Sequence, residues 1–302
     1  MTPAISEPPR STCGLLLTAA SCGPLRLVFE PPLSRGAVAL SAHAILDVVN
    51  LTKRFGGLTA VDGCSLDIGR GRITGLIGPN GAGKTTLFNL VSGFLRPDSG
   101  QVFFKDEDIT GLPPWQMLHK RLCRTFQIPR EFKELTVMEN LMVVPTKQIG
   151  ERLWAPWFLR PRVAREEAVI RNRARDLLAR VNLLDHADAP AWTLSGGQKK
   201  LLELVRAMMG EPELLLLDEP GAGVNPTQME ELARHIQRLV AEHSVTVVLI
   251  EHDMDLVMSL CDSVIVMTQG RTLAEGAPED VRQDARVLEA YLGTRYSVPN
   301  ER

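Results

Sequence analysis

A glycine-rich stretch at residues 78–86 constrains this chain more than any other part of the sequence. It reads Gly-Pro-Asn-Gly-Ala-Gly-Lys-Thr-Thr and fits G-x-x-x-x-G-K-[ST], the pattern of a phosphate-binding loop. The apolar run Ile73–Ile77 before it predicts a buried strand, and Leu87–Val91 after it predicts the start of a helix. A glycine-rich turn of an ordinary α/β protein is the alternative, but the flanking strand and helix favour the phosphate loop.

The residue types in this stretch suit an anion. Glycines let the backbone turn tightly and point several N–H groups at one anion, and the helix N-terminus adds the positive end of its dipole. We expect Lys84 to reach the β- and γ-phosphates of a nucleotide and Thr85 to hold Mg²⁺. The expected phosphate-binding residues are Gly78, Pro79, Asn80, Gly81, Ala82, Gly83, Lys84, Thr85 and Thr86.

The overall composition narrows the class of protein. The 302 residues include 34 basic and 36 acidic side chains, a net charge of −2. This balance gives no support for general nucleic-acid binding, which usually shows a basic excess, although it leaves room for a local patch. The five cysteines form no C-x-x-C pair, which favours reduced thiols, and no apolar run approaches the 18 residues of a membrane span.

The first 44 residues differ from the rest. They are rich in proline and poor in charge, and the apolar run Leu15–Ala20 before Cys22 faintly resembles an export signal. That run is short and has only Arg10 before it, offset by Glu7, which argues against a signal. We therefore expect residues 1–44 to be a disordered extension, or the product of an upstream start codon, and residues 45–302 to be the folded domain.

A second glycine-rich group opens a later helix. After the segment 194–198, which reads Leu-Ser-Gly-Gly-Gln, apolar residues recur at helical spacing at Leu201, Leu202, Val205, Met208 and Met209. A serine with two glycines at a helix start predicts another anion-binding site. Its residues are Ser195, Gly196, Gly197 and Gln198.

Two carboxylates follow a strongly apolar run. The four leucines at 214–217 predict a central strand buried on both faces, and Asp218 and Glu219 come directly after it. Ligands of open α/β sheets bind at the carboxyl ends of the strands. We expect Asp218 to support Mg²⁺ and Glu219 to polarise an attacking water. Simple capping of the strand end is the alternative, and the four-leucine run argues against it.

Three single residues are ambiguous by themselves. Gln127 fits a sensor of Mg²⁺ and water at a flexible joint, but a lone glutamine is a weak signal. His252 follows the apolar strand at 245–250 and could contact a γ-phosphate or be structural. Phe55 precedes a Gly-Gly turn and suits either an adenine platform or core packing.

Taken together, these stretches resemble the ATP-binding cassette (ABC) ATPase family. The order matches: the phosphate loop, Gln127, the Leu-Ser-Gly-Gly-Gln signature, the strand ending in Asp218 and Glu219, then His252. The signature is the most specific of them, since other phosphate-loop ATPases lack it. The resemblance implies that Phe55 stacks on adenine.

Finer features resemble one branch, the ATPase subunits of branched-chain (hydrophobic) amino-acid importers. Asn225 stands where most ABC proteins have aspartate, as is common in this branch, while Gly221 and Val224 replace the usual alanine and leucine. The other branch-like segments are 85–94, 124–127, 135–141, 250–254 and 290–293. Residues 1–44 match nothing in the family.

The resemblance implies an α/β fold of the phosphate-loop NTPase class. Its parts are a RecA-like core, an antiparallel β subdomain and a helical subdomain at about residues 130–210. The implied reaction is ATP hydrolysis with ATP and Mg²⁺ as cofactors. The catalytic residues would be Glu219, His252 and Gln127, and the metal site would involve Thr85, Gln127 and Asp218.

The resemblance also implies partners. Two cassettes, identical or homologous, would pair head to tail, so that the phosphate loop of one and Ser195–Gln198 of the other enclose each ATP. Two separate membrane permease subunits would dock on a groove in the helical subdomain, and a periplasmic binding protein would act indirectly, with no nucleic acid involved. The place of work would be the cytoplasmic face of a bacterial inner membrane.

Other functions stay open at this point. Urea or short-amide importers have closely similar ATPases. A non-transport ABC ATPase acting on ribosomes or DNA usually has two fused cassettes or a long coiled coil, whereas this chain has one of each motif and no sustained heptads. A nucleotide-binding regulator without turnover is disfavoured because Glu219 and His252 are both present.

Overall fold

The computed structural model describes residues 44–292 except 127–130, 147, 152–153, 155–156 and 158. The fold below belongs to the compact unit formed by residues 39–302. Gln127 and all of the expected N-terminal extension except Ala44 lie outside the described residues.

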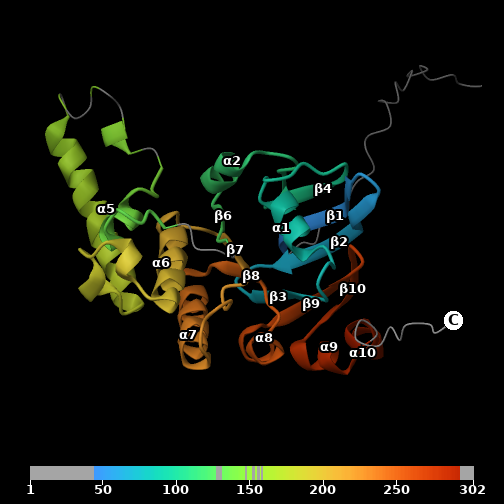
Figure 1. Ribbon diagram of the computed structural model, residues 1–302. Helices are drawn as coiled ribbons and strands as arrows, with labels where there is room; N and C mark the ends of the chain where they lie inside the picture. Colours follow the sequence, from blue (N-terminus) through green and yellow to red (C-terminus); the bar gives the residue numbers. More distant parts are fainter. Residues whose placement is uncertain are drawn as a thin grey trace, which may run out of the picture. The chain divides into compact units, whose positions relative to one another are not determined.

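A six-stranded sheet forms the centre of this unit, with strand order β10-β9-β3-β8-β7-β6 (Figure 1). All neighbours are parallel except β9 and β10, which form the hairpin at the edge. The strands are β3 (Ile73–Ile77), β6 (Leu122–Arg124), β7 (Leu214–Asp218), β8 (Thr246–Ile250), β9 (Ser263–Thr268) and β10 (Arg271–Gly276). Every residue of β3, β7 and β8 is buried, so the predicted buried strands at 73–77 and 214–217 are confirmed.

A second sheet is wholly antiparallel, with the order β2-β1-β4-β5. This is the expected antiparallel β subdomain. Its strands are β1 (Ala44–Phe55), β2 (Leu58–Gly69), β4 (Ser99–Phe104) and β5 (Glu107–Asp108).

The helices cover the central sheet and build the helical subdomain. They are α1 (Lys84–Val91), α2 (Pro114–His119), α3 (Val137–Met142), α5 (Arg160–Arg180), α6 (Gly196–Met209), α7 (Pro226–His243), α8 (Met254–Leu260), α9 (Pro278–Gln283) and α10 (Ala285–Leu292). Short 3₁₀ segments lie at Ile149–Glu151, Leu184–His186 and Ala191–Thr193. Helices α3, α5 and α6 contact one another and form a helical subdomain, and α5 lies at the left of Figure 1.

Alternate leucines of β7 belong to two different hydrophobic cores. Leu214 and Leu216 join a core that includes α1 and the antiparallel sheet, whereas Leu215 and Leu217 join a core shared with α5, α6 and α7. Successive side chains of a strand point to opposite faces, so an unbroken apolar run is what a strand covered on both sides needs. Glu219 directly follows this strand, which is anchored in both cores.

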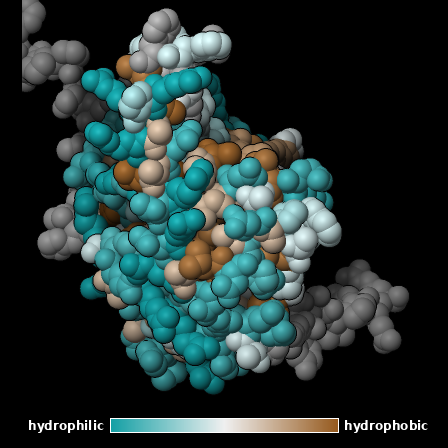
Figure 2. Space-filling model, turned by 90° about the vertical axis from the view of Figure 1, so that its left-hand side faces the viewer, coloured by the Kyte–Doolittle hydropathy of each residue, from teal (hydrophilic) through white to brown (hydrophobic). Residues whose placement is uncertain are grey.

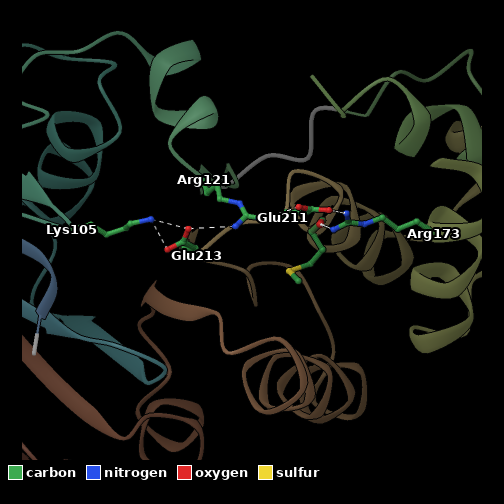
Figure 3. Close-up of polar contacts among 6 residues, drawn as sticks. Lys105, Arg121, Arg173, Glu211 and Glu213 are labelled. Atoms are coloured by element: carbon green, nitrogen blue, oxygen red, sulfur yellow. Dashed lines mark hydrogen bonds and ion pairs between the residues drawn. The ribbon is translucent and has the colours of Figure 1, made fainter. Parts of the chain in front are cut away.

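A chain of ion pairs joins the antiparallel sheet, the central sheet and α5 (Figure 3). Lys105 Nζ lies 2.9 Å from Glu213, and Arg121 contacts both Glu213 at 3.5 Å and Glu211 at 2.6 Å. Glu211 also pairs with Arg173 of α5. The side chains of Arg121 and Glu211 are about half exposed, at 47% and 51%, so water screens these pairs and each contributes little to stability.

One strand of the central sheet was missed in the sequence. The three residues of β6 are separated from α2 by only Lys120 and Arg121, and they are too few to show an alternating pattern. The strand exists because the sheet extends to it through β7, where Leu122 pairs with Leu214.

Candidate active site

The phosphate loop has a backbone that only glycine tolerates at two positions. Gly78 and Gly83 have φ values of 148° and 100°. A Cβ on Gly78 would lie 2.1 Å from the carbonyl oxygen of Met267, and one on Gly83 would lie 2.3 Å from that of Ala60. A side chain at either glycine would therefore collide with the backbone of a neighbouring strand and displace the loop.

Lys84 begins α1 and turns back onto the loop. Its Nζ donates hydrogen bonds to the carbonyl oxygens of Gly78 at 2.6 Å and Pro79 at 3.0 Å. Burial lowers the pKa of Lys84, and the nearby charges of Glu219 and Asp218 oppose that shift. The ammonium group is thus placed between the loop and the carboxylates at the end of β7. Thr85, the next residue, is exposed at the helix start.

Asp218 is buried and already has a cationic partner. Its Oδ2 accepts a hydrogen bond from Arg124 Nη2 at 2.8 Å. The exposed fraction is 5% for the Arg124 side chain and 6% for that of Asp218. Arg124 also donates to Asn89 Oδ1 at 2.7 Å and Ser92 Oγ at 3.0 Å, both near the end of α1. The rings of Phe88, Phe94 and Phe126 surround its guanidinium group.

Glu219 and His252 meet at the ends of adjacent strands. Their side chains approach to 2.6 Å between Glu219 Oε1 and His252 Nε2, and the Glu219 amide donates to the carbonyl of Ile250 at 3.0 Å. Glu219 has a φ of 48°, in the left-handed region that side chains rarely adopt. Its backbone turns sharply where the strand ends, and the pairing with β8 holds it there.

Glu251 was not singled out in the sequence, yet it fixes the loop after Glu219. Its two oxygens accept hydrogen bonds from the amides of Gly221 at 2.8 Å and His252 at 3.2 Å. Burial raises the pKa of Glu251 above its ordinary value, and the nearby charge of Glu219 adds to that shift. The Glu251 side chain therefore joins the two segments that carry Glu219 and His252.

The signature residues build the start of α6. Ser195 Oγ accepts from the Gln198 amide at 3.3 Å, and Gln198 Oε1 accepts from the Ser195 amide at 2.9 Å, which is a reciprocal capping box. The predicted helix start is therefore confirmed. Gln198 also contacts His186 at 3.2 Å, and further along the helix Lys200 Nζ lies 3.4 Å from the carbonyl oxygen of Glu219. Ser195 and Gly196 are exposed.

Of the two remaining candidate residues, the structure describes Phe55 but not Gln127. Phe55 is 46% exposed at the end of β1, with Lys53 Nζ 5.8 Å from its ring centre, so it is not a core residue. An exposed ring is available for stacking. Gln127 lies outside the described residues, although Phe126 before it donates its amide hydrogen to Glu203 of α6 at 2.8 Å.

Comparison with known proteins decides the family. The sequence pattern of the ABC transporter family matches residues 61–222. This chain belongs to the ATP-binding cassette family. A second pattern, described as a branched-chain amino acid ATP-binding cassette transporter, matches residues 271–297 and places this ABC ATPase in that branch.

Relatives of this ABC ATPase extend over nearly its whole described length. It is 45% identical over 83% of its length to a Pseudomonas aeruginosa high-affinity branched-chain amino acid transport ATP-binding protein, and 43% identical over 83% to the Escherichia coli counterpart. In both cases 99% of the relative is covered. A crystal structure of an ABC transporter cassette in its ADP conformation has a TM-score of 0.72, with 38% identity and 83% and 99% coverage. The expected family, branch and fold are confirmed.

The ABC ATPase site thus has two groups of residues. The structure brings Lys84, Asp218, Glu219 and His252 together at the carboxyl ends of β7 and β8, beside the phosphate loop. The signature residues form the second group, at the N-terminus of α6, which suits the binding of an anion. Arg124 and Glu251 were missed as site residues. The only sequence signal for Arg124 was a basic residue directly after the apolar pair Leu122 and Cys123, and its place beside β7 follows from the strand order of the sheet.

Proposed function

We propose that this protein is the ATP-binding subunit of an importer for branched-chain, hydrophobic amino acids. The observation that carries the proposal is the match of residues 271–297 to the branched-chain cassette pattern, beside relatives with that named function along 83% of the chain. The alternatives of a urea or short-amide importer and of a ribosome- or DNA-acting ATPase gain nothing from these comparisons.

The residues described above fit ATP and Mg²⁺. The phosphate loop would hold the nucleotide phosphates, and Lys84 would exchange the loop carbonyls for phosphate oxygens. Thr85 and Asp218, with Gln127, are the proposed residues at the metal, which would neutralise phosphate charge when bound. Asp218 Oδ2 accepts a hydrogen bond from Arg124, which restrains the orientation of the carboxylate. Phe55 would stack on the adenine.

The proposed chemistry is attack of water on the γ-phosphorus. Glu219 would accept a proton from the water as the new P–O bond forms and the bond to the β-phosphate oxygen breaks, releasing ADP. His252, 2.6 Å from Glu219 Oε1, would hold that carboxylate and contact the γ-phosphate. Preorganised charge is the main contribution that proteins make to such a reaction.

We propose that two cassettes, identical or homologous, pair head to tail around two ATP molecules. The exposed start of α6 at Ser195 and Gly196 supports this, because a helix N-terminus at the surface can receive an anion brought by a second chain. ATP would then act as the switch for pairing.

Ser195→Arg is expected to leave ATP binding by the single cassette intact and to abolish ATP-induced pairing. The larger cation would fill the space in which the partner's γ-phosphate is to lie. Size-exclusion chromatography with ATP, in a Glu219→Gln background, measures this, with Thr193→Arg on the preceding 3₁₀ segment as the matched control. A dimer that still forms with Ser195→Arg would contradict the head-to-tail arrangement.

A groove beside α5 is the proposed docking site for two separate permease subunits. Its volume is about 740 Å³, and it lies between the helical subdomain and the α2–β6 region of the core, with Val144, Ile149 and Ile170 on one side and Leu118 on the other. Figure 2 shows the α5 side of the molecule, where hydrophilic side chains surround separate hydrophobic patches. Among the described residues, no helix is long and apolar enough to cross a membrane. The protein would work on the cytoplasmic face of the inner membrane. A periplasmic binding protein would act indirectly, and no nucleic acid would be involved.

Uptake of labelled leucine, isoleucine and valine tests the function. A strain deleted for the gene is expected to lose most of this uptake, and a plasmid copy is expected to restore it, whereas a copy with Lys84→Ala is not. Unchanged uptake of all three, with loss of urea or short-amide uptake, would assign the protein to the sister group. No change in any solute, with co-purification of ribosomes or DNA, would overturn the transport function.

A further inference from the structure

The loop after Glu219 begins with a tight turn whose inner amide is buried. The carbonyl oxygen of Glu219 accepts a hydrogen bond from the Ala222 amide at 3.1 Å, which closes a turn over residues 219–222. Gly221, inside that turn, is buried. A buried backbone N–H group without a partner costs free energy comparable to a lost hydrogen bond. The turn behind Glu219 therefore needs an acceptor from elsewhere in the chain.

Glu251 supplies that acceptor from the end of the neighbouring strand. It directly follows β8, which lies beside β7 in the central sheet (Figure 1), and it is only 5% exposed. Its Oε1 accepts a hydrogen bond from the Gly221 amide at 2.8 Å. Its Oε2 accepts one from the amide of His252 at 3.2 Å. One carboxylate thus bridges the turn behind Glu219 and the backbone of His252.

The close approach of Glu251 depends on the glycine at position 221. A Cβ on Gly221 would lie 3.0 Å from Glu251 Oε1 and 2.0 Å from Met229 Cε. These two side chains therefore occupy the space that the side chain of an alanine would need. Glycine at this position leaves room for the carboxylate beside the amide, whereas alanine would crowd it.

The backbone of Glu219 needs such support. Its φ of 48° lies in the left-handed region, and residues in that region persist only where their surroundings hold them. The Glu219 amide donates to the carbonyl oxygen of Ile250 at 3.0 Å, and the Glu219 carbonyl oxygen lies 3.4 Å from Lys200 Nζ. Glu251 fixes the residue two positions further on. Because Glu251 also holds the amide of His252, both partners of the 2.6 Å contact between Glu219 Oε1 and His252 Nε2 depend on it.

We propose that Glu251 is a positioning residue for ATP hydrolysis, and that its two backbone contacts fix the placement of Glu219 relative to His252. Glu251 acts through these two residues and has no contact with a reacting atom in the proposed mechanism. The inference rests on the roles proposed above for Glu219 and His252. It is independent of the transported solute and of cassette pairing.

Glu251→Gln in the full-length chain tests the proposal, because glutamine keeps the length of the side chain but has only one oxygen. Its NH₂ group would face one of the two backbone N–H groups, so that one of the two hydrogen bonds is lost. We expect kcat to fall about tenfold, since a small misplacement of catalytic groups slows the reaction. The Kd for MgATP is expected to match that of the parent, because both contacts of Glu251 lie outside the phosphate loop. Phosphate release measures kcat, and equilibrium binding measures the Kd.

Asp262→Asn is the matched control. Asp262 Oδ2 likewise accepts a hydrogen bond from a backbone amide, that of Ile73 at 2.8 Å, but at the amino end of β3. The site lies at the carboxyl ends of the strands, so the same chemical change is expected to leave kcat as in the parent.

A double variant separates positioning from general destabilisation. In the Glu219→Gln background the carboxylate that Glu251 positions is absent, so adding Glu251→Gln is expected to change the residual rate by less than about threefold. A further tenfold fall in that background would show that Glu251 acts independently of Glu219, and would overturn the proposal. An unchanged kcat in Glu251→Gln would also overturn it. So would a weaker affinity for MgATP or a lower melting temperature that accounts for the slower hydrolysis.

The same assay distinguishes this inference from the proposed function. Hydrolysis by Glu219→Gln at the parent rate would contradict the proposed mechanism and this inference with it. Slow hydrolysis by Glu219→Gln, with Glu251→Gln at the parent rate, would contradict this inference alone.

Discussion

Glu219→Gln is expected to slow ATP hydrolysis about 10²-fold or more while ATP still binds, the usual scale for loss of a general base. The glutamine amide has nearly the shape of the carboxylate but accepts no proton from water. Glu219 Oε1 lies 2.6 Å from His252 Nε2, and the Glu219 amide is fixed to Ile250, so the substitution should change the chemistry more than the position. Phosphate release under saturating MgATP measures the rate, and equilibrium binding measures the affinity.

Glu213→Gln is the matched control for this experiment. Both glutamates flank β7, but Glu213 precedes its amino end, where it pairs with Lys105 and Arg121 far along the strand from the site. The control is expected to hydrolyse ATP at nearly the parent rate, because it weakens only two partly exposed ion pairs. Hydrolysis by Glu219→Gln at the parent rate would show that another group accepts the proton.

The local features of this fold were accessible from the sequence. The strand–loop–helix at 73–91 could be predicted because each part has a local signature: an apolar run, glycines and a helix start. The capping box of Ser195 and Gln198 has the same local character, since its two hydrogen bonds join residues three apart. The four leucines of β7 show burial on both faces directly.

Contacts between distant segments were not accessible. Arg124 and Asp218 are 94 positions apart, and Glu251 reaches Gly221 across 30, so no periodicity or spacing connects them. The strand order brings β6 beside β7 and β7 beside β8, and only that order places these side chains together.

The sequence did not show which charged side chains are buried, even where it singled out the residue. Asp218, Lys84, Lys200 and Glu251 are all buried polar or charged residues. Composition counts them with the solvated majority, because charged side chains are mostly exposed. Their burial is costly unless they are paired, which makes the pairs around the end of β7 more sensitive to substitution than the exposed ones of Figure 3.

Arg124→Met should therefore lower the free energy of unfolding by about 3–5 kcal/mol, the cost of leaving one charge of a buried pair without its partner. The substitution leaves Asp218 in a site where its partner was 2.8 Å away and both side chains were nearly inaccessible. It also removes the hydrogen bonds to Asn89 and Ser92 that tie β6 to α1. Urea unfolding followed by circular dichroism measures the loss.

Arg121→Met is the matched control, because Arg121 lies only three positions earlier and is also an ion-paired arginine. Those contacts, to Glu211 and Glu213, are exposed, so the control should cost no more than about 1 kcal/mol. In the Arg124→Met background, adding Asp218→Leu should recover part of the stability, since no unpaired charge then stays buried. Equal losses for the two arginines would show that burial of the Arg124–Asp218 pair has no special weight, and a further loss from Asp218→Leu would show that Asp218 is stabilised by groups other than Arg124.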